Sequence, residues 1–241
     1  MATAQAGAFA CRSRPSERPM YFPAALVAAS IVFAGFAPTY YLKGIFDVPD
    51  LTTLKHLHGA VMTSWFALFV TQAWLVSAGH VRLHRQLGVA GILVAMIVIA
   101  VGMQLGIASA RAGVSPLASI PALVFLAMPV GEMVAFAGLF AAAIALRKRS
   151  DWHKRFMLAA SVAMLAPAFA RMPIISDGGP PAFFGLTDLV LLGCIAFDTG
   201  THRRLHPAFA VAFAWVVAIQ VGRLVFSQTK LWLDIASWLI A

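Results

Sequence analysis

Charged residues are scarce in this chain. Only 11% of its 241 residues are charged, whereas about a quarter are charged in an ordinary soluble domain, and 61% are hydrophobic. The mean hydropathy is +0.85. These values exclude a soluble globular domain, a disordered chain and a nucleic-acid-binding module with a charged surface. A membrane-spanning helix needs about 20 mostly apolar residues, so seven such helices would leave too little chain for a sizeable extramembrane domain.

Cysteine is also scarce, with Cys11 in a polar N-terminal segment and Cys194 in an apolar one. Two cysteines placed in this way predict neither a disulfide framework nor a cysteine-based metal site. The sequence also lacks a phosphate-binding loop, a nucleotide-binding motif and a Ser-His-Asp arrangement. Any chemistry must therefore depend on the few other polar residues.

Long apolar segments separated by short polar links predict an all-α polytopic membrane protein, a seven-transmembrane-helix bundle over residues 20–228. The predicted spans are about 20–42, 56–79, 87–110, 120–146, 156–172, 184–201 and 207–228. Pro129 should kink the fourth span. Residues 1–19 are predicted to be a flexible cytoplasmic tail, since no apolar stretch follows an N-terminal basic region as in a signal peptide. Residues 229–241 are amphipathic and predicted to lie in the membrane interface.

The basic residues predict the orientation of the bundle. Lysine and arginine number 18 against 9 acidic residues. Twelve of the 18 fall in the N-terminal segment and in the three links on its side of the membrane: Arg12, Arg14, Arg18, Arg82, Arg85, Arg147, Lys148, Arg149, Lys154, Arg155, Arg203 and Arg204. Because cytoplasmic loops are enriched in such residues, the N-terminus should be cytoplasmic and the C-terminus outside. The predicted partner is the lipid bilayer rather than nucleic acid.

Polar residues inside the apolar spans are the first candidate site. Glu132 lies near the predicted midplane, one turn from Pro129, and several other polar residues fall in the outer half. Because such groups are costly in lipid, they predict a pocket that binds, senses or carries a small molecule or ion. Its candidate residues are Glu132, Arg223, Asp188, Arg171, Gln104, Gln220 and His58. The alternative is an ion pair that only holds helices together.

Histidines near the cytoplasmic links are the second candidate site. His80 and His84 are four residues apart, as are His202 and His206. Residues at this spacing share a helix face, so each pair could bind a metal ion. The alternative is that these histidines cap helix starts and contact lipid phosphate.

A b-type haem is a further hypothesis. His84 begins the third predicted span and His153 precedes the fifth, both at the cytoplasmic face. Two neutral imidazoles at similar depth on facing helices can ligate one haem iron. The functions left open are therefore a binder or carrier of a small molecule, a haem electron-transfer protein, and an accessory or assembly subunit of a membrane complex.

The histidine positions carry a partial resemblance to a known family. His84 and His153 are placed like the haem ligands of helices three and five in the transmembrane ascorbate-dependent b-type cytochromes, and His58 looks like the helix-two ligand. The fourth predicted span has no histidine, so this resemblance implies at most one of that family's two haems.

A second set of short motifs covers most of residues 55–210. It comprises His58-Gly59 with Trp65 and Gln72, His84-Arg85-x-x-Gly88, His153-Lys154-Arg155-x-Met157 and His206-Pro207-Ala208. As a set, these motifs resemble a family of uncharacterised bacterial multi-pass inner-membrane proteins. The resemblance implies the membrane fold and a location in a bacterial inner membrane, but no activity.

Overall fold

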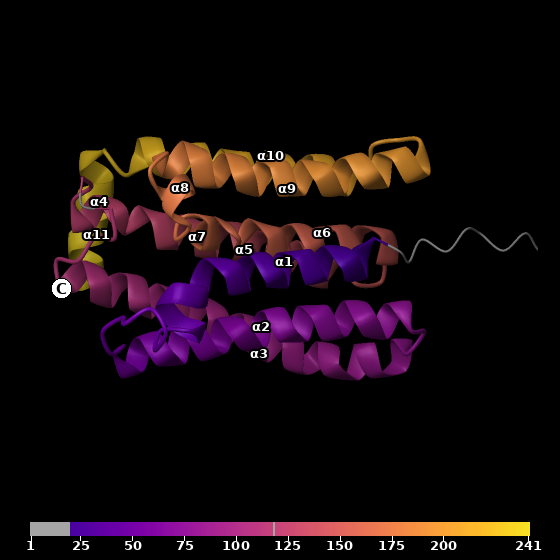
Figure 1. Ribbon diagram of the computed structural model, residues 1–241. Helices are drawn as coiled ribbons and strands as arrows, with labels where there is room; N and C mark the ends of the chain where they lie inside the picture. Colours follow the sequence, from indigo (N-terminus) through magenta and orange to yellow (C-terminus); the bar gives the residue numbers. More distant parts are fainter. Residues whose placement is uncertain (1–19, 118) are drawn as a thin grey trace, which may run out of the picture.

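The computed structural model describes residues 20–117 and 119–241 (Figure 1). The described residues are all-helical, with 80% of them in helices and no strand among them. The predicted tail of residues 1–19 lies outside the described residues. The all-α prediction is therefore confirmed for the rest of the chain.

The helices follow the apolar segments of the sequence. They are α1 (Tyr21–Phe36), the π-helix η1 (Ala37–Tyr41), α2 (Thr53–Ser77), α3 (Val81–Arg111), α4 (Ala122–Phe125), α5 (Ala127–Ala145), α6 (Ser150–Ala163), α7 (Ala166–Phe169), α8 (Pro173–Ser176), α9 (Gly179–His202), α10 (Pro207–Phe226) and α11 (Lys230–Ile240). Six segments are long and apolar enough to cross a membrane: Tyr21–Tyr41, Thr53–Ser77, Val81–Arg111, Ala122–Ala145, Gly179–His202 and Pro207–Phe226. The chain is thus an integral membrane protein by length and composition of its helices.

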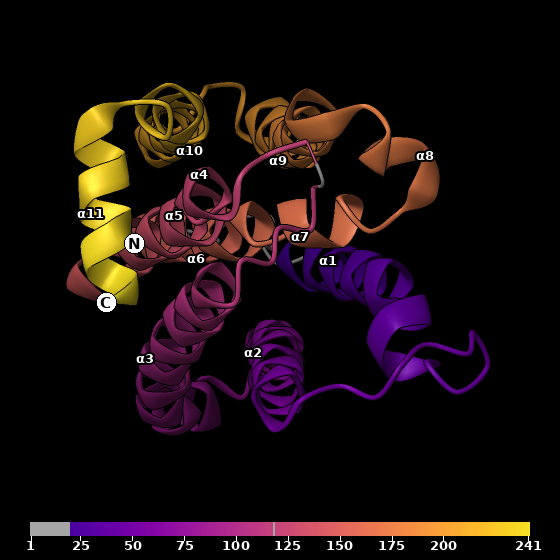
Figure 2. The same cartoon turned by 90° about the vertical axis from the view of Figure 1, so that its left-hand side faces the viewer.

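The long helices lie side by side in a bundle. Figure 1 shows the start of α1 and the α2–α3, α5–α6 and α9–α10 links at one end, which we call the basic end, and α11 and the C-terminus at the opposite end. Viewed along the bundle, α5, α6 and α7 lie between the α1–α3 side and the α9–α10 side (Figure 2). The exposed bases Arg82, Arg85, Arg147, Lys148, Arg149, Arg203 and Arg204 lie in or beside those three links.

The fifth predicted span is not one continuous helix. α6 ends at Ala163 and α7 begins at Ala166. Pro167 has no N–H to donate to the carbonyl one turn earlier, so the helical hydrogen bonds are interrupted there. The predicted count of seven membrane-spanning helices is therefore not confirmed, since six segments of the described residues satisfy the length and hydropathy needed for a span.

The interrupted segment is nevertheless the centre of the bundle. Leu158, Leu165 and Ala168 have no exposed surface. α1 packs directly on the backbone of α7, because a Cβ at Gly35 would collide with the carbonyl group of Ala168. Glycine at this position permits the close approach of two backbones.

The fourth predicted span is also interrupted, close to the expected proline kink. α4 ends at Phe125 and α5 begins at Ala127, so the break at Leu126 lies just before Pro129. Since Pro129 lacks an N–H, the Phe125 carbonyl loses its usual α-helical donor. The break thus falls at the freed carbonyl rather than at the proline itself.

The loop between η1 and α2 is closed by an ion pair. Lys43 Nζ donates to Asp50 Oδ1 at 2.7 Å. This hydrogen bond and the charge of Lys43 hold the pKa of the Asp50 carboxyl below its usual value. The two ends of the loop are therefore tied together at the surface.

The C-terminal segment forms α11, which runs across the end of the bundle opposite the basic end (Figure 1). Its inward face carries the buried Trp232, whose indole N–H donates to the Leu123 carbonyl at 2.9 Å. Its outward face carries Leu231 and Trp238, which are 62% and 76% exposed. This two-sided helix agrees in pattern with an interfacial position, which stays a prediction.

Candidate functional site

Two histidines from different helices meet at the basic end of the bundle. His84 lies in the first turn of α3 and His153 in the first turn of α6. Their ring centroids are 6.3 Å apart, with an angle of 75° between the planes. Two metal–nitrogen bonds of about 2 Å, with a little over 1 Å from each nitrogen to its ring centre, would separate two imidazoles on one metal by about 6.4 Å. The spacing is within the range of about 4.5–7 Å of an ordinary edge-to-face ring contact, and it also leaves room for one metal ion in line between two ring nitrogens.

The His153 ring is oriented by a main-chain contact. Its Nδ1 lies 2.9 Å from the carbonyl oxygen of Ala143 on α5. A carbonyl oxygen only accepts, so Nδ1 must carry the proton, and in the neutral ring Nε2 then keeps its lone pair. Metal-binding histidines commonly have this arrangement, in which a carbonyl fixes the tautomer and the ring orientation.

Two buried polar atoms without a hydrogen-bond partner belong to His84 and to its neighbour Gln72. His84 Nδ1 and Gln72 Oε1 are both buried and make no hydrogen bond. Gly88, one turn after His84 on α3, has only the Gln72 amide nitrogen within 4 Å of the place where a Cβ would stand. Buried polar atoms of this kind call for a physical explanation. His84, His153 and Gln72 are therefore the polar groups at this end of the bundle that could hold a ligand.

An aromatic cluster lies deeper in the bundle. Trp65 on α2 packs edge-on against Phe136 and Phe140 of α5, at centroid distances of 4.9 and 5.7 Å. Trp65 is two helical turns from Gln72, and Phe140 is one turn from Ala143. These rings form an apolar wall on the inward side of the histidine pair.

The polar residues predicted for an outer-half pocket separate into three places. Arg223 Nη1 donates to Glu132 Oε2 at 2.8 Å and to the Met128 carbonyl at 3.0 Å, and both side chains of the ion pair are 6% exposed. The guanidinium also lies 4.1 Å from the ring centre of Phe184. Glu132 and Arg223 thus lie together, as an ion pair with each other. Their contacts do not by themselves indicate a ligand pocket.

The other predicted pocket residues lie around or away from this pair. Gln220 Nε2 donates to Asp188 Oδ1 at 3.0 Å, which joins α10 to α9. Arg171 follows α7, where Nη1 donates to the Pro167 carbonyl at 2.7 Å and the guanidinium stacks on Phe36.

His58 and Gln104 complete the predicted set. His58 on α2 interacts electrostatically with Arg171 and has a buried, unpartnered Nδ1. Gln104 is exposed on α3. One common pocket for all seven residues therefore stays a prediction.

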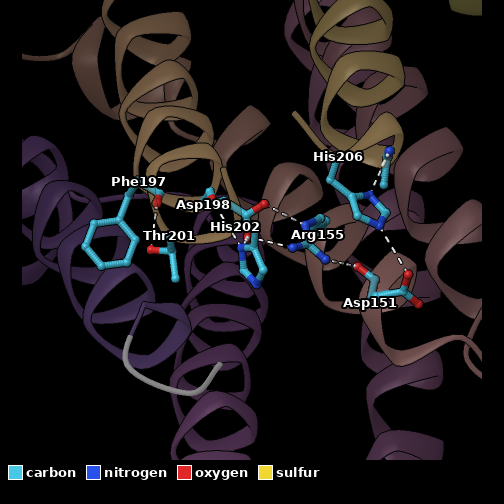
Figure 3. Close-up of polar contacts among 8 residues, drawn as sticks. Asp151, Arg155, Phe197, Asp198, Thr201, His202 and His206 are labelled. Carbon is cyan, nitrogen blue, oxygen red and sulfur yellow. Dashed lines mark hydrogen bonds and ion pairs between the residues drawn. The ribbon is translucent and has the colours of Figure 1, made fainter. Parts of the chain in front are cut away.

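The structure reveals a buried ion pair that the sequence did not predict (Figure 3). Arg155 Nε and Nη2 donate to the two carboxylate oxygens of Asp198 at 3.0 and 2.7 Å, and Nη1 donates to the Asp151 carbonyl at 2.8 Å. Arg155 and Asp198 are each 2% exposed. Arg155 is therefore not one of the surface bases with which the sequence grouped it. The available signal was Asp198, an acid in an apolar span, which needs a partner.

The histidines at the end of α9 and the start of α10 make one contact with another helix besides contacts within their own segments. His202 Nδ1 lies 2.8 Å from the Asp198 carbonyl oxygen. His206 Nδ1 accepts from the Ala208 N–H at 3.1 Å, so its Nε2 is the donor to Asp151 Oδ2 at 3.1 Å. His206 thus caps the start of α10, which is the alternative function considered for these histidines.

Metal binding by the His80–His84 and His202–His206 pairs receives no support from these contacts. His80 is exposed and packs near Trp74, with ring centroids 6.1 Å apart. Within residues 20–117 and 119–241, no three histidine, cysteine or acidic side chains gather as a metal site would require. A metal at either pair stays a prediction.

Comparison with known proteins gives no match to a family model, a curated protein or a solved structure.

Proposed function

We propose that this chain is a membrane-embedded electron-transfer protein that binds one b-type haem between His84 and His153. The observation that carries the proposal is the 6.3 Å spacing of the two rings, combined with the Ala143 carbonyl that leaves His153 Nε2 free to ligate. A haem held by two imidazoles supplies one-electron redox chemistry.

The protein's own residues have distinct parts in this proposal. Ala143 holds the His153 ring and its tautomer, while Gln72 and Gly88 provide a polar group and free space beside His84. The aromatic wall around Trp65 keeps water from the deeper part of the bundle.

We further propose that α6 and α7 together form a seventh, interrupted crossing. A crossing there would bring the α5–α6 and α9–α10 links to the same side of the membrane. The exposed bases beside these links support a cytoplasmic basic end and an outer C-terminus, whereas the bacterial inner membrane stays a prediction.

An absorption spectrum tests the haem. The full chain is expressed with a haem precursor, purified in detergent, and measured in oxidised and reduced form. The wild type should show a Soret band and the spectrum of a low-spin b-type haem. His84→Ala and His153→Ala should each lose it, and His80→Ala, a matched control at the exposed rim, should keep it. Added imidazole should restore part of the spectrum in a folded His153→Ala variant.

Absence of a Soret band in the wild type would overturn the proposal. It would also be overturned if both ligand variants kept the wild-type spectrum. Size-exclusion chromatography identifies a variant that has failed to fold, and imidazole rescue then remains as the second measurement.

A second candidate function is binding of a small molecule or ion in the outer half. It is favoured by Glu132 Oε1 and Arg223 Nε, which are buried and unpartnered although the two residues form an ion pair. Glu132→Gln should then abolish thermal stabilisation by the ligand in a screen of small anions and cations, while Gln104→Ala should not. A role as an accessory subunit stays a prediction and would be indicated by co-purified membrane partners.

A further inference from the structure

α6 presents two opposite faces in its first two turns. Asp151 and Arg155 are four residues apart and share one face, whereas His153, between them, is about 200° away from each around the helix axis. Contacts made by the first face therefore determine where His153 points.

The face with Asp151 and Arg155 is bonded to two other helices (Figure 3). Arg155 makes its two bonds to Asp198 on α9, and the Asp151 carboxylate accepts from His206 at the start of α10. The bidentate contact of a planar guanidinium with a carboxylate is directional as well as attractive. It resists rotation of α6 about its own axis.

The opposite face carries the His153–Ala143 contact described above. Asp198 and Ala143 thus hold α6 from two sides, and the His153 ring lies between α6 and α3. A rotation of one residue, about 100°, would carry the ring away from His84.

We propose that Arg155, held by Asp198, is a positioning residue that fixes the rotation of α6 and thereby directs His153 toward His84. The inference rests on the proposed haem function for its spectroscopic test and on the helix geometry alone for a second test. In this role, the buried ion pair has a function other than stability. Well-packed apolar residues could stabilise the fold equally well, but they could not make directional bonds.

The test replaces both charges at once. Arg155→Met with Asp198→Leu keeps the volume and the burial but removes the directional bonds, so the protein should still fold. The matched control is Arg223→Met with Glu132→Leu, which removes the other buried pair, on α10 and α5, without touching α6. Asp198→Glu is a conservative variant that keeps the carboxylate.

The first measurement is haem ligation. The Arg155/Asp198 double variant should show a haem dissociation constant about tenfold or more above the wild-type value. It should also lose the electron paramagnetic resonance signal of bis-imidazole ferric haem. The Arg223/Glu132 double variant should keep that signal, and Asp198→Glu should restore part of it. A wild-type signal in a folded Arg155/Asp198 double variant would refute the positioning role.

The second measurement needs no haem. His84→Cys and His153→Cys are introduced together into a chain whose Cys11 and Cys194 are serine, and the rate of cross-linking by a bifunctional thiol reagent long enough to span the two positions is followed. Because the reagent links the two thiols only when both side chains point into the same space, the Arg155/Asp198 substitutions should slow this rate about fivefold or more, and the Arg223/Glu132 substitutions should not. Equal rates would refute the positioning role. A wild type without haem would refute only the haem function.

Discussion

The side chain of Arg223 on α10 occupies the space that a side chain at Gly131 on α5 would fill. A Cβ at Gly131 would stand 2.6 Å from Arg223 Cδ. The missing side chain lets α10 approach α5, so that Arg223 reaches both Glu132 and the Met128 carbonyl. A small residue and a buried charge are therefore parts of one helix contact.

Gly131→Ala should consequently weaken the protein. Alanine is normally the better helix residue by about 0.5–1 kcal/mol, but here its methyl group displaces Arg223, and overpacking costs about 1–3 kcal/mol. The free energy of unfolding, measured by denaturant titration in mixed micelles, should fall. Gly193→Ala on α9 is the matched control, since nothing lies within 4 Å of its Cβ position, and it should be neutral or stabilising. Equal effects of both substitutions would contradict this account of the α5–α10 contact.

Removing one partner of the Arg155–Asp198 pair should be much more harmful than removing both. Asp198→Ala leaves a buried guanidinium without its counter-charge and should lower the free energy of unfolding by about 3–5 kcal/mol. The Arg155→Met, Asp198→Leu double variant should recover most of that loss. The same unfolding titration measures both. Additive losses in the double variant would show that the two side chains do not act as a pair.

Apolar length in the sequence was sufficient to predict the helical membrane fold and six of the spans. Apolar length alone did not predict that α6 and α7 are separate, although Pro167 in the fifth span was a signal of the same kind as Pro129 in the fourth. The contact between Gly35 and Ala168 compensates for this break through backbone packing, which leaves no periodic signal in either segment.

The candidate site was predictable to a different degree at each residue. Matching depth at the start of two helices agrees with the closeness of the His84 and His153 rings, whereas haem ligation by them stays a prediction. Arg155 was assigned to the surface because its neighbours are basic, and only its partner on a distant helix places it in the interior. An ion pair between residues far apart in the chain leaves no pattern in the sequence around either residue.

The close contact of α1 with α7 gives another prediction. Gly35→Ala should destabilise the protein strongly, because the new methyl group meets main-chain atoms of Ala168 that cannot rotate away. The midpoint of thermal unfolding in detergent should fall, and it should fall further than for Gly131→Ala, where the obstacle is a side chain. Gly44→Ala, with nothing within 4 Å, is the control. A small effect at Gly35 would mean that α1 does not pack this closely on the interrupted segment.

The orientation of the bundle can be tested with enzyme fusions. Alkaline phosphatase fused after Ala241 should be active, since the enzyme folds only outside the cytoplasm and the basic residues predict an outer C-terminus. The same enzyme fused after Arg149, in the exposed α5–α6 link, should be inactive. A green fluorescent protein at the two sites should give the reverse pattern.

If α6 and α7 failed to cross, both ends of that segment would lie on the same side. A fusion in the α8–α9 region, after Asp177, would then report the same side as the fusion after Arg149, whereas an interrupted crossing requires opposite sides.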